Sequence, residues 1–308
     1  MSLAPATTAA QQPPLSPADL EAGVGLRVGP YGVRLRTTID TVARSISVLY
    51  RDYPRTAEGA FIDFDVAIRR PDSLRRWWHP QVVFDHGGEL PFNALPGDQG
   101  LPLLEWGLNW CVYSLSHAHL TLHAAVLERG GRALILPAPS GSGKSTLCAG
   151  LAFGGWRLLS DELALVCPAQ RDLIPNPRPI SLKNESIRVV QEFAPRLEVG
   201  SVVRETLKGV VAHVKPPTSA VAAAATRARP GWIVLPRFRP GAAAKLTALP
   251  RARALMALVE NAFNYDVFGS DGFDLLASVV DRSDCFEFEY SSLPEAVAVF
   301  ERLAPHDA

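Results

Sequence analysis

The sequence predicts an α/β protein in which a smaller α+β domain precedes a larger domain built on a mixed β-sheet. Three observations support this prediction. The apolar run ALILP at 133–137 leads into a Ser/Gly loop and then into the helical pattern STLCAGLAF. Further short apolar runs, WRLLS at 156–160 and GWIVL at 231–235, are typical of buried strands. In the N-terminal part, FIDFDVAI at 61–68 alternates with a period of two, as a half-buried strand does.

The order of these patterns divides the chain into three parts. Residues 1–18 are mostly Ala, Thr, Gln and Pro with little to bury, which predicts a disordered tail. Residues 19–115 carry strand patterns, a helix over 40–50 and an apolar helix over 101–115, and form the predicted N-terminal domain. Residues 116–308 form the second domain, with an amphipathic helix over 251–268 and a strand followed by a helix over 285–304.

Composition excludes several classes of protein. The chain has 308 residues, with 31 Lys and Arg against 31 Asp and Glu. Zero net charge argues against a protein that coats nucleic acid or an anionic membrane. No apolar run reaches the roughly 18 residues of a membrane helix, and the four cysteines include no C-x-x-C pair. We therefore expect a cytoplasmic protein without a nucleic-acid or membrane partner.

The strongest motif is the loop between ALILP and the helix. Its end, Gly-Lys-Ser, is that of a Walker A phosphate loop (P-loop), and a strand before it and a helix after it are the context which that motif requires. Two glycines let consecutive N–H groups turn inward toward phosphate oxygens, and the helix dipole adds to their attraction. Ala138 stands where the motif has its first glycine, which is harmless only if its φ is negative. The predicted nucleotide-binding residues are Ser140, Gly141, Ser142, Gly143, Lys144, Ser145 and Thr146.

Two acids end the next predicted strand. Asp161 and Glu162 follow WRLLS, and one helix and one strand fill the chain between Lys144 and them. The strand can therefore lie beside the phosphate-loop strand and bring both carboxylates near a bound γ-phosphate. One carboxylate can deprotonate an acceptor hydroxyl while the other holds Mg²⁺. The alternative is a solvated acidic turn.

Hairpin geometry places a histidine beside the loop. If Gly130-Gly131 is a two-residue turn, Arg129 faces Arg132, and counting outward places His123 opposite position 138. A cation or hydrogen-bond donor at that point could contact a phosphate or the acceptor. A metal cluster of His117, His119 and His123 is a weaker alternative, because no acidic partner adjoins it.

These motifs together resemble a known family. LHAAVLERGGRALILPAPSGSGKSTL followed by WRLLSDE is similar to the catalytic domain of HPr kinase/phosphorylase, whose P-loop fold is shared with phosphoenolpyruvate carboxykinase. The segments PNPRPISLKNESI, LKGVVAHVKPP and ENAFNYDVFGSDGFDLL resemble more closely the subgroup called HPr-kinase-related kinase A. The resemblance covers about 117–308 and does not extend to the first hundred residues.

The resemblance implies a role for each matching residue. Lys144 and Ser145 would contact nucleotide and Mg²⁺, Asp161 would be the catalytic base, and Glu162 would be the neighbouring acid. His123 matches the active-site histidine of the family. Asp-Glu replaces the Asp-Asp of the bifunctional enzymes, and the Glu-x-Arg-Gly-x-Gly segment is absent, so HPr as substrate and phosphorolysis do not follow. Homo-oligomers are also implied. By the resemblance, Arg178 lies where the family's signature segment has its basic part, and Arg251 and Arg253 precede a helix as the family's basic loop does. All three are therefore candidate contacts to phosphate or substrate.

Three functions are consistent with the sequence. The first is an ATP-dependent kinase, with Mg²⁺, that phosphorylates a hydroxyl, most simply serine, of a protein or peptide. The second is a kinase for a small molecule, with the same phosphate machinery but a closed acceptor pocket. The third is a nucleotide-binding sensing or assembly module that transfers no phosphate. The acceptor has no local signature in the sequence.

The even charge balance conceals a division along the chain. Residues 206–253 contain nine Lys and Arg and no acid, whereas residues 254–308 contain eleven acids and two arginines. One interpretation is that the two segments pair with each other at the surface. The other is that the basic segment, with Arg251 and Arg253 at its end, neutralises nucleotide phosphates or guides an acidic acceptor.

Overall fold

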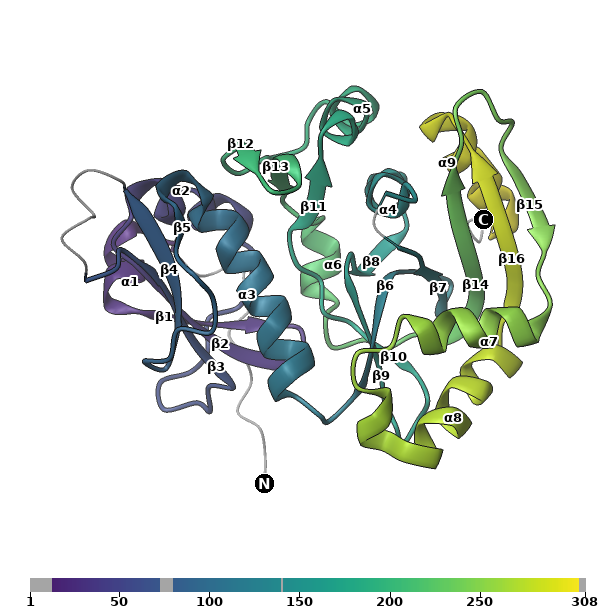
Figure 1. The fold of residues 1–308 in the computed structure, drawn as a ribbon, viewed down its shortest axis with the longest axis horizontal. Coiled ribbons are helices and arrows are strands. Elements are labelled where there is room, and N and C mark those ends of the chain that lie inside the picture. Colours follow the sequence, from purple (N-terminus) through teal and green to yellow (C-terminus); the bar gives the residue numbers. More distant parts are fainter. Residues whose placement is uncertain (1–12, 73–79, 140, 305–308) are drawn as a thin grey trace.

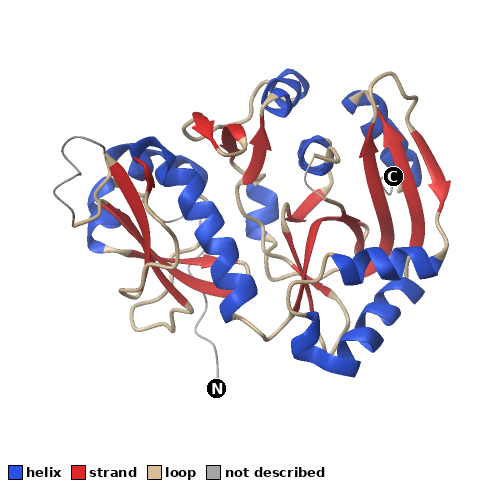
Figure 2. Ribbon diagram, viewed as in Figure 1, coloured by secondary structure: helices blue, strands red, loops and turns tan. Residues whose placement is uncertain are grey.

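A computed structural model describes residues 13–72, 80–139 and 141–304 of the chain. The fold is α/β with mixed sheets, as the sequence predicts. A five-stranded sheet with its helices forms one side of the molecule, and a larger sheet flanked by helices forms the other (Figures 1 and 2). Of the helices in these ranges, none is both long and apolar enough to cross a membrane.

The five-stranded sheet has its strands in sequence order. The pair β2–β3 is parallel and the others are antiparallel. Helix α2 connects the parallel pair, and its buried face, with Val42, Ile46 and Leu49, packs into the core. The elements are α1 Pro17–Ala22, β1 Val24–Val28, β2 Tyr31–Thr37, α2 Asp40–Leu49, β3 Phe64–Arg69, β4 Gln81–His86, β5 Leu95–Pro96, the 3₁₀ helix η3 Gly97–Gln99 and α3 Gly100–Leu115.

Ordered structure begins before residue 19, where the tail was expected to end. Leu15 is buried, and Ser16 caps α1 in a capping box with Asp19. Ser16-Pro17 is a helix start, but the apolar pattern after it is too short to predict a helix from the sequence. Residues 1–12 of the expected tail lie outside the described residues.

The larger sheet has the order β10-β9-β6-β7-β14-β16-β15, with β8 also paired to β6. Strands β7, β14 and β16 are parallel, and β6 runs antiparallel to β7. The strands are β6 Leu120–Arg129, β7 Arg132–Pro137, β8 Arg157–Ser160, β9 Leu163–Val166, β10 Leu173–Ile174, β14 Arg229–Phe238, β15 Lys245–Ala248 and β16 Asp284–Tyr290.

The β6–β7 hairpin has the predicted register, but the next strand does not lie where it was expected. Arg129 faces Arg132, and Ala124 faces Pro137. Strand β8 pairs with β6, so it is not a neighbour of β7, whose other neighbour is β14. Because β6 is antiparallel to both β7 and β8, those two strands still point the same way. Their carboxyl ends therefore meet at one edge of the sheet.

Helices cover both faces of the larger sheet. Helices α4 and α9 pack against one face with Trp156 and Phe288, and α7 and α8 pack against the other with Ile135 and Ile233. A separate three-stranded sheet, ordered β11-β13-β12, lies beside α4 (Figure 1). The remaining elements are α4 Lys144–Phe153, β11 Ile180–Lys183, α5 Glu185–Phe193, β12 Val203–Thr206, β13 Gly209–Val214, α6 Thr218–Ala222, α7 Arg251–Glu260, α8 Tyr265–Asp281 and α9 Leu293–Leu303.

The helix predicted over 251–268 is interrupted. It ends at Glu260, and α8 begins at Tyr265. Between them, the Asn264 side chain accepts a hydrogen bond from the Thr121 amide at 2.9 Å and donates one to the His119 carbonyl at 2.9 Å. These bonds to β6 and to the residues before it compete with a continuous helix, which the local pattern alone favours.

One hydrophobic cluster includes residues from both sides of the molecule. The cluster that contains Leu104 and Leu108 of α3 also contains Leu163 and Leu165 of β9. The N-terminal sheet is therefore packed through α3 against the larger sheet, close to the edge where β8 ends.

Candidate functional site

Two glycines of the loop between β7 and α4 adopt a left-handed backbone conformation. Gly141 and Gly143 both have φ of +88°, a conformation that favours glycine. A Cβ at Gly143 would lie 2.5 Å from the Tyr290 hydroxyl, which donates a hydrogen bond to the Gly143 carbonyl at 2.8 Å. Ala138 is not among the residues with positive φ, so alanine is unstrained there, as the motif requires. Ser140 lies outside the described residues.

Lys144 opens helix α4 at the end of this loop. Its side chain is buried, and its Nζ has no hydrogen-bond partner among the described residues. Burial lowers the pKa of Lys144, and the carboxylates of Asp161 and Glu162 oppose that effect. A buried ammonium without a partner costs folding free energy. Such a group is poised to bind an anion.

Asp161 and Glu162 lie in the turn between β8 and β9. Oδ2 of Asp161 accepts a hydrogen bond from the Ser181 amide at 2.9 Å, while Oδ1 has no partner within the described part of the chain. Burial raises the pKa of Asp161, helped by Glu162 and opposed by Lys144. Burial alone would raise the pKa of Glu162 too, but the positive charges of Lys144, Lys183 and Arg178 outweigh it and lower that pKa.

His123 lies on β6 opposite Leu163 of β9, at the edge where the loop begins. Burial, followed by the charge of Lys144, lowers its pKa to about 4. At neutral pH the imidazole is therefore uncharged. Of the two roles expected from the sequence, the structure favours a hydrogen-bond donor or acceptor over a cation.

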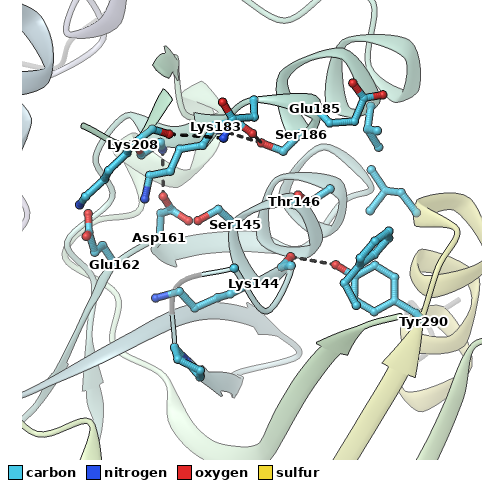
Figure 3. A pocket seen from close by; sticks show the side chains of 18 of the residues that line it. Lys144, Ser145, Thr146, Asp161, Glu162, Lys183, Glu185, Ser186, Lys208 and Tyr290 are labelled. Atoms are coloured by element: carbon cyan, nitrogen blue, oxygen red, sulfur yellow. Dashed lines mark hydrogen bonds between the residues drawn. The ribbon is translucent and has the colours of Figure 1, made fainter. Parts of the chain in front are cut away.

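The loop, Lys144, Ser145, Thr146, the two acids and His123 line one cavity of about 680 Å³. The residues that the sequence predicts to lie near one another therefore line the same cavity. In the close-up, Asp161 and Ser145 lie near each other, with Lys144 below them (Figure 3).

Other cavity walls were not predicted. Lys183 at the end of β11 and Lys208 in the β12–β13 turn line one end, and Phe238 and Tyr290 line the other. No local motif distinguishes these two lysines from the other lysines of the chain. Tyr290 ends a period-two strand pattern, and its strand β16 reaches the loop because it is parallel to β14, which is parallel to β7.

Arg178 does not line the cavity but is buried behind it. Its Nη1 donates to Oδ1 of Asn109 at 2.8 Å, and its Nη2 donates to Oε2 of Glu105 at 2.8 Å. Nδ2 of Asn109 in turn donates to Oε2 of Glu162 at 2.7 Å, and the Tyr50 hydroxyl donates to Oε1 of Glu105 at 2.7 Å. Asn109 of α3 therefore links Arg178 to Glu162. The expected direct contact to phosphate or substrate is not what the structure shows, because Arg178 does not line the cavity and both of its Nη atoms already donate to residues of α3.

The sequence prediction also expects Arg251 and Arg253 to contact phosphate or substrate, but neither lines the cavity. They begin α7, just after Leu249, whose amide donates to the Cys285 carbonyl near the start of β16. The cavity lies beyond the other end of β16, at Tyr290.

The two arginines are exposed, and both pair with acids of the acidic segment. Arg251 pairs with Asp281 at 3.8 Å, and Arg253 pairs with Glu287 at 3.2 Å. Pairing between the basic and acidic segments therefore accounts for these two arginines. A contact to phosphate or to an acidic acceptor is still consistent with Lys208 of the basic segment, which lines the cavity.

The donor set of the cavity fits Mg²⁺ held together with a phosphate. Mg²⁺ prefers oxygen ligands and is usually bound by one or two carboxylates plus substrate phosphates. The two residues expected to hold it, Ser145 with its hydroxyl and Glu162 with its carboxylate, both line the cavity. In residues 13–72, 80–139 and 141–304 no group of three His, Cys, Asp or Glu side chains is arranged to hold a metal by itself. Within those ranges, the three histidines His117, His119 and His123 therefore do not form a metal cluster.

A comparison with known protein families finds a match to part of the chain. A family model described as SynChlorMet cassette protein ScmC matches residues 103–179. The matched segment runs from α3 through the glycine-rich loop to the two acids and Arg178. None of the curated proteins compared with the chain matches it.

Proposed function

We propose that this protein is an ATP-dependent kinase with a P-loop fold of the HPr kinase type, which transfers the γ-phosphate to a hydroxyl, most simply serine, of a protein or peptide. One observation carries the proposal. The unpartnered Nζ of Lys144 and the unpartnered Oδ1 of Asp161 lie in the same cavity, at the start of a helix that follows a loop with two positive-φ glycines. Buried polar atoms without partners are uncommon in folded proteins, and two of opposite charge that line one cavity are typical of a site that water, an ion or a ligand fills.

The residues divide into those that hold the nucleotide and those that act on the acceptor. The amides of 141–146 and the Lys144 ammonium would hold the phosphates, and Ser145 and Glu162 would hold Mg²⁺. MgATP, when bound, supplies the phosphoryl group and the charge that offsets its transfer. Asn109 fixes the Glu162 carboxylate by its 2.7 Å hydrogen bond.

Asp161 is the proposed base. Its Oδ1 is free to accept the proton of the acceptor hydroxyl, while Oδ2 is held by the Ser181 amide. The raised pKa makes Asp161 a better proton acceptor than an ordinary aspartate. His123, uncharged at neutral pH, can donate a hydrogen bond to a phosphate oxygen or to the acceptor.

The test combines nucleotide binding with phosphate transfer. We expect MgATP to raise the melting temperature of the full chain, because ligand at a hundred times its Kd stabilises by about 2.7 kcal/mol. Lys144→Ala should abolish that shift. Asp161→Asn should keep it but lower the labelling of acceptor peptides by [γ-³²P]ATP by about a hundredfold or more.

Exposed residues provide matched controls. Lys245→Ala on β15 and Asp271→Asn on α8 should leave both measurements unchanged. Labelling that survives Asp161→Asn contradicts the assigned base. Tight MgATP binding without transfer to any peptide would indicate the sensing module, and transfer to metabolites alone would indicate a small-molecule kinase.

A further inference from the structure

Two lysines of the cavity wall are not neutralised by an ion pair with any acid that the structure describes. Lys183 and Lys208 both line the cavity, and neither forms an ion pair within the described chain. By contrast, Lys215, the residue directly after β13, forms an ion pair with Asp52. In Figure 3 the side chains of Lys183 and Lys208 both reach toward Asp161 and Glu162.

The backbone holds these two lysines side by side. Asn184, next to Lys183, has φ of +52°, which is rare for a residue other than glycine. Its amide donates to the Val210 carbonyl at 2.9 Å, its Oδ1 accepts from the Val210 amide at 3.0 Å, and its Nδ2 donates to the Lys208 carbonyl at 3.3 Å. A strained residue bonded three times to the opposite segment fixes the distance between the lysines. Such strain is concentrated at functional sites.

The position of Lys208 is further fixed by an aromatic ring. Its Nζ lies 5.2 Å from the centre of the Trp106 ring on α3, within range of a cation–π contact. Burial lowers the pKa of Lys208, and the neighbouring charge of Lys183 lowers it further, while Glu162 opposes both. Holding two like charges together costs free energy that an anionic ligand would offset.

The location separates this pair from the phosphate loop. Lys144 and the loop lie on one side of the two acids, and Lys183 and Lys208 approach them from the other side (Figure 3). If nucleotide phosphates occupy the loop, the hydroxyl that Asp161 deprotonates must come from the opposite side. The lysines therefore face the acceptor.

We propose that Lys183 and Lys208 bind an anionic group, a carboxylate or a phosphate, that the acceptor carries next to its reacting hydroxyl. This inference rests on the proposed kinase function and specifies the class of acceptor. An acidic or already phosphorylated serine-containing segment is the substrate that this site selects.

The experiment uses three pools of fluorescein-labelled nonapeptides with a central serine. The pools are alike except that the positions flanking the serine hold Asp, Asn or phosphoserine. Binding to the full chain is measured by anisotropy in the presence of Mg²⁺ and a non-hydrolysable ATP analogue, and labelling is measured with [γ-³²P]ATP. The proteins are wild type, Lys183→Met, Lys208→Met and the control Lys245→Met.

We expect wild type and Lys245→Met to bind the Asp or phosphoserine pool about tenfold more tightly than the Asn pool, the effect of one charge-assisted contact. In Lys183→Met and Lys208→Met that preference should fall toward one, with the affinity for the ATP analogue unchanged. The pool with the greater preference identifies the carboxylate or the phosphate.

Equal binding of all pools by wild type overturns the inference, as does a preference that persists in both lysine variants. A loss of affinity for the ATP analogue in those variants also overturns it, since the lysines would then serve the nucleotide. Selective binding without any labelling keeps the anion site and removes the kinase function, so the two failures are distinguishable.

Discussion

His123 shows how burial decides the chemical state of a single residue. It lies on β6 among buried neighbours and near Lys144, and its pKa falls to about 4. The ordinary pKa of histidine is about 6.5. Between these values the unfolded chain binds more protons at this residue than the folded protein does.

Stability should therefore fall as the pH falls from 6.5 to 4, because the free energy of unfolding rises with pH wherever the unfolded state binds more protons. His123→Gln should remove this part of the pH dependence and flatten the curve over that window. Urea unfolding at several pH values between 7 and 4.5 measures it. His119 and His213, whose pKa values burial also lowers, remain in the variant and contribute equally to both curves.

His117→Gln is the matched control, since it replaces a histidine at an exposed position. If His123→Gln loses stability with falling pH as steeply as wild type does, the imidazole is not buried in its neutral form. The role as an uncharged donor at the site would then be wrong.

The loop is the element whose conformation the sequence predicts best. A strand, two glycines and a helix start are local features, and each one constrains its own backbone. The sequence also predicts the β6–β7 register, because a two-residue turn fixes the pairing of the strands on either side. The tight packing of Tyr290 on Gly143 is not local, since it joins residues far apart in the chain.

Two alanine substitutions in this loop separate backbone strain from packing. Gly141 and Gly143 have the same φ of +88°, but a Cβ at Gly141 would meet nothing within 4 Å, whereas one at Gly143 would lie 2.5 Å from the Tyr290 hydroxyl. Gly141→Ala should cost about 1–2 kcal/mol from strain alone. Gly143→Ala should cost more, as measured by urea unfolding.

Tyr290→Phe tests the cause of that difference. It removes the hydroxyl that the new methyl group would strike, so it should recover part of the loss in the Gly143→Ala background while destabilising the wild-type protein slightly. Equal losses for Gly141→Ala and Gly143→Ala would show that the loop moves away from Tyr290.

At the scale of the whole molecule, a buried polar network joins the N-terminal side to the site. Tyr50, Glu105 and Asn109 come from α3 and its surroundings, while Arg178 and Glu162 belong to the other side. The family-model match begins only at residue 103, within α3. In the structure, α3 supplies the hydrogen bond that orients Glu162.

Removal of the Glu105 charge should destabilise the whole protein. Glu105 is 2% exposed and pairs with Arg178 at 2.8 Å, so Glu105→Gln leaves a buried guanidinium without its carboxylate. Breaking such a pair from one side costs about 3–5 kcal/mol. Urea unfolding should show this loss, and the exposed control Glu58→Gln should show none.

Glu105→Gln combined with Arg178→Met should recover part of the stability, because no unpaired charge remains. A loss below about 1 kcal/mol for Glu105→Gln would contradict a desolvated pair and match a surface one.

The sequence by itself determined the features that depend on neighbouring residues: the glycine-rich loop with Lys144, the acids that end a strand, and the hairpin that places His123. Only the tertiary structure decided which strand neighbours β8, the burial of Arg178 against Glu105, and the distance of Arg251 and Arg253 from the cavity. It also brought Lys183 and Lys208 to the acids. The reason is physical: turns and helix starts follow from local backbone preferences, whereas the partner of a charged side chain depends on which distant segments pack against it.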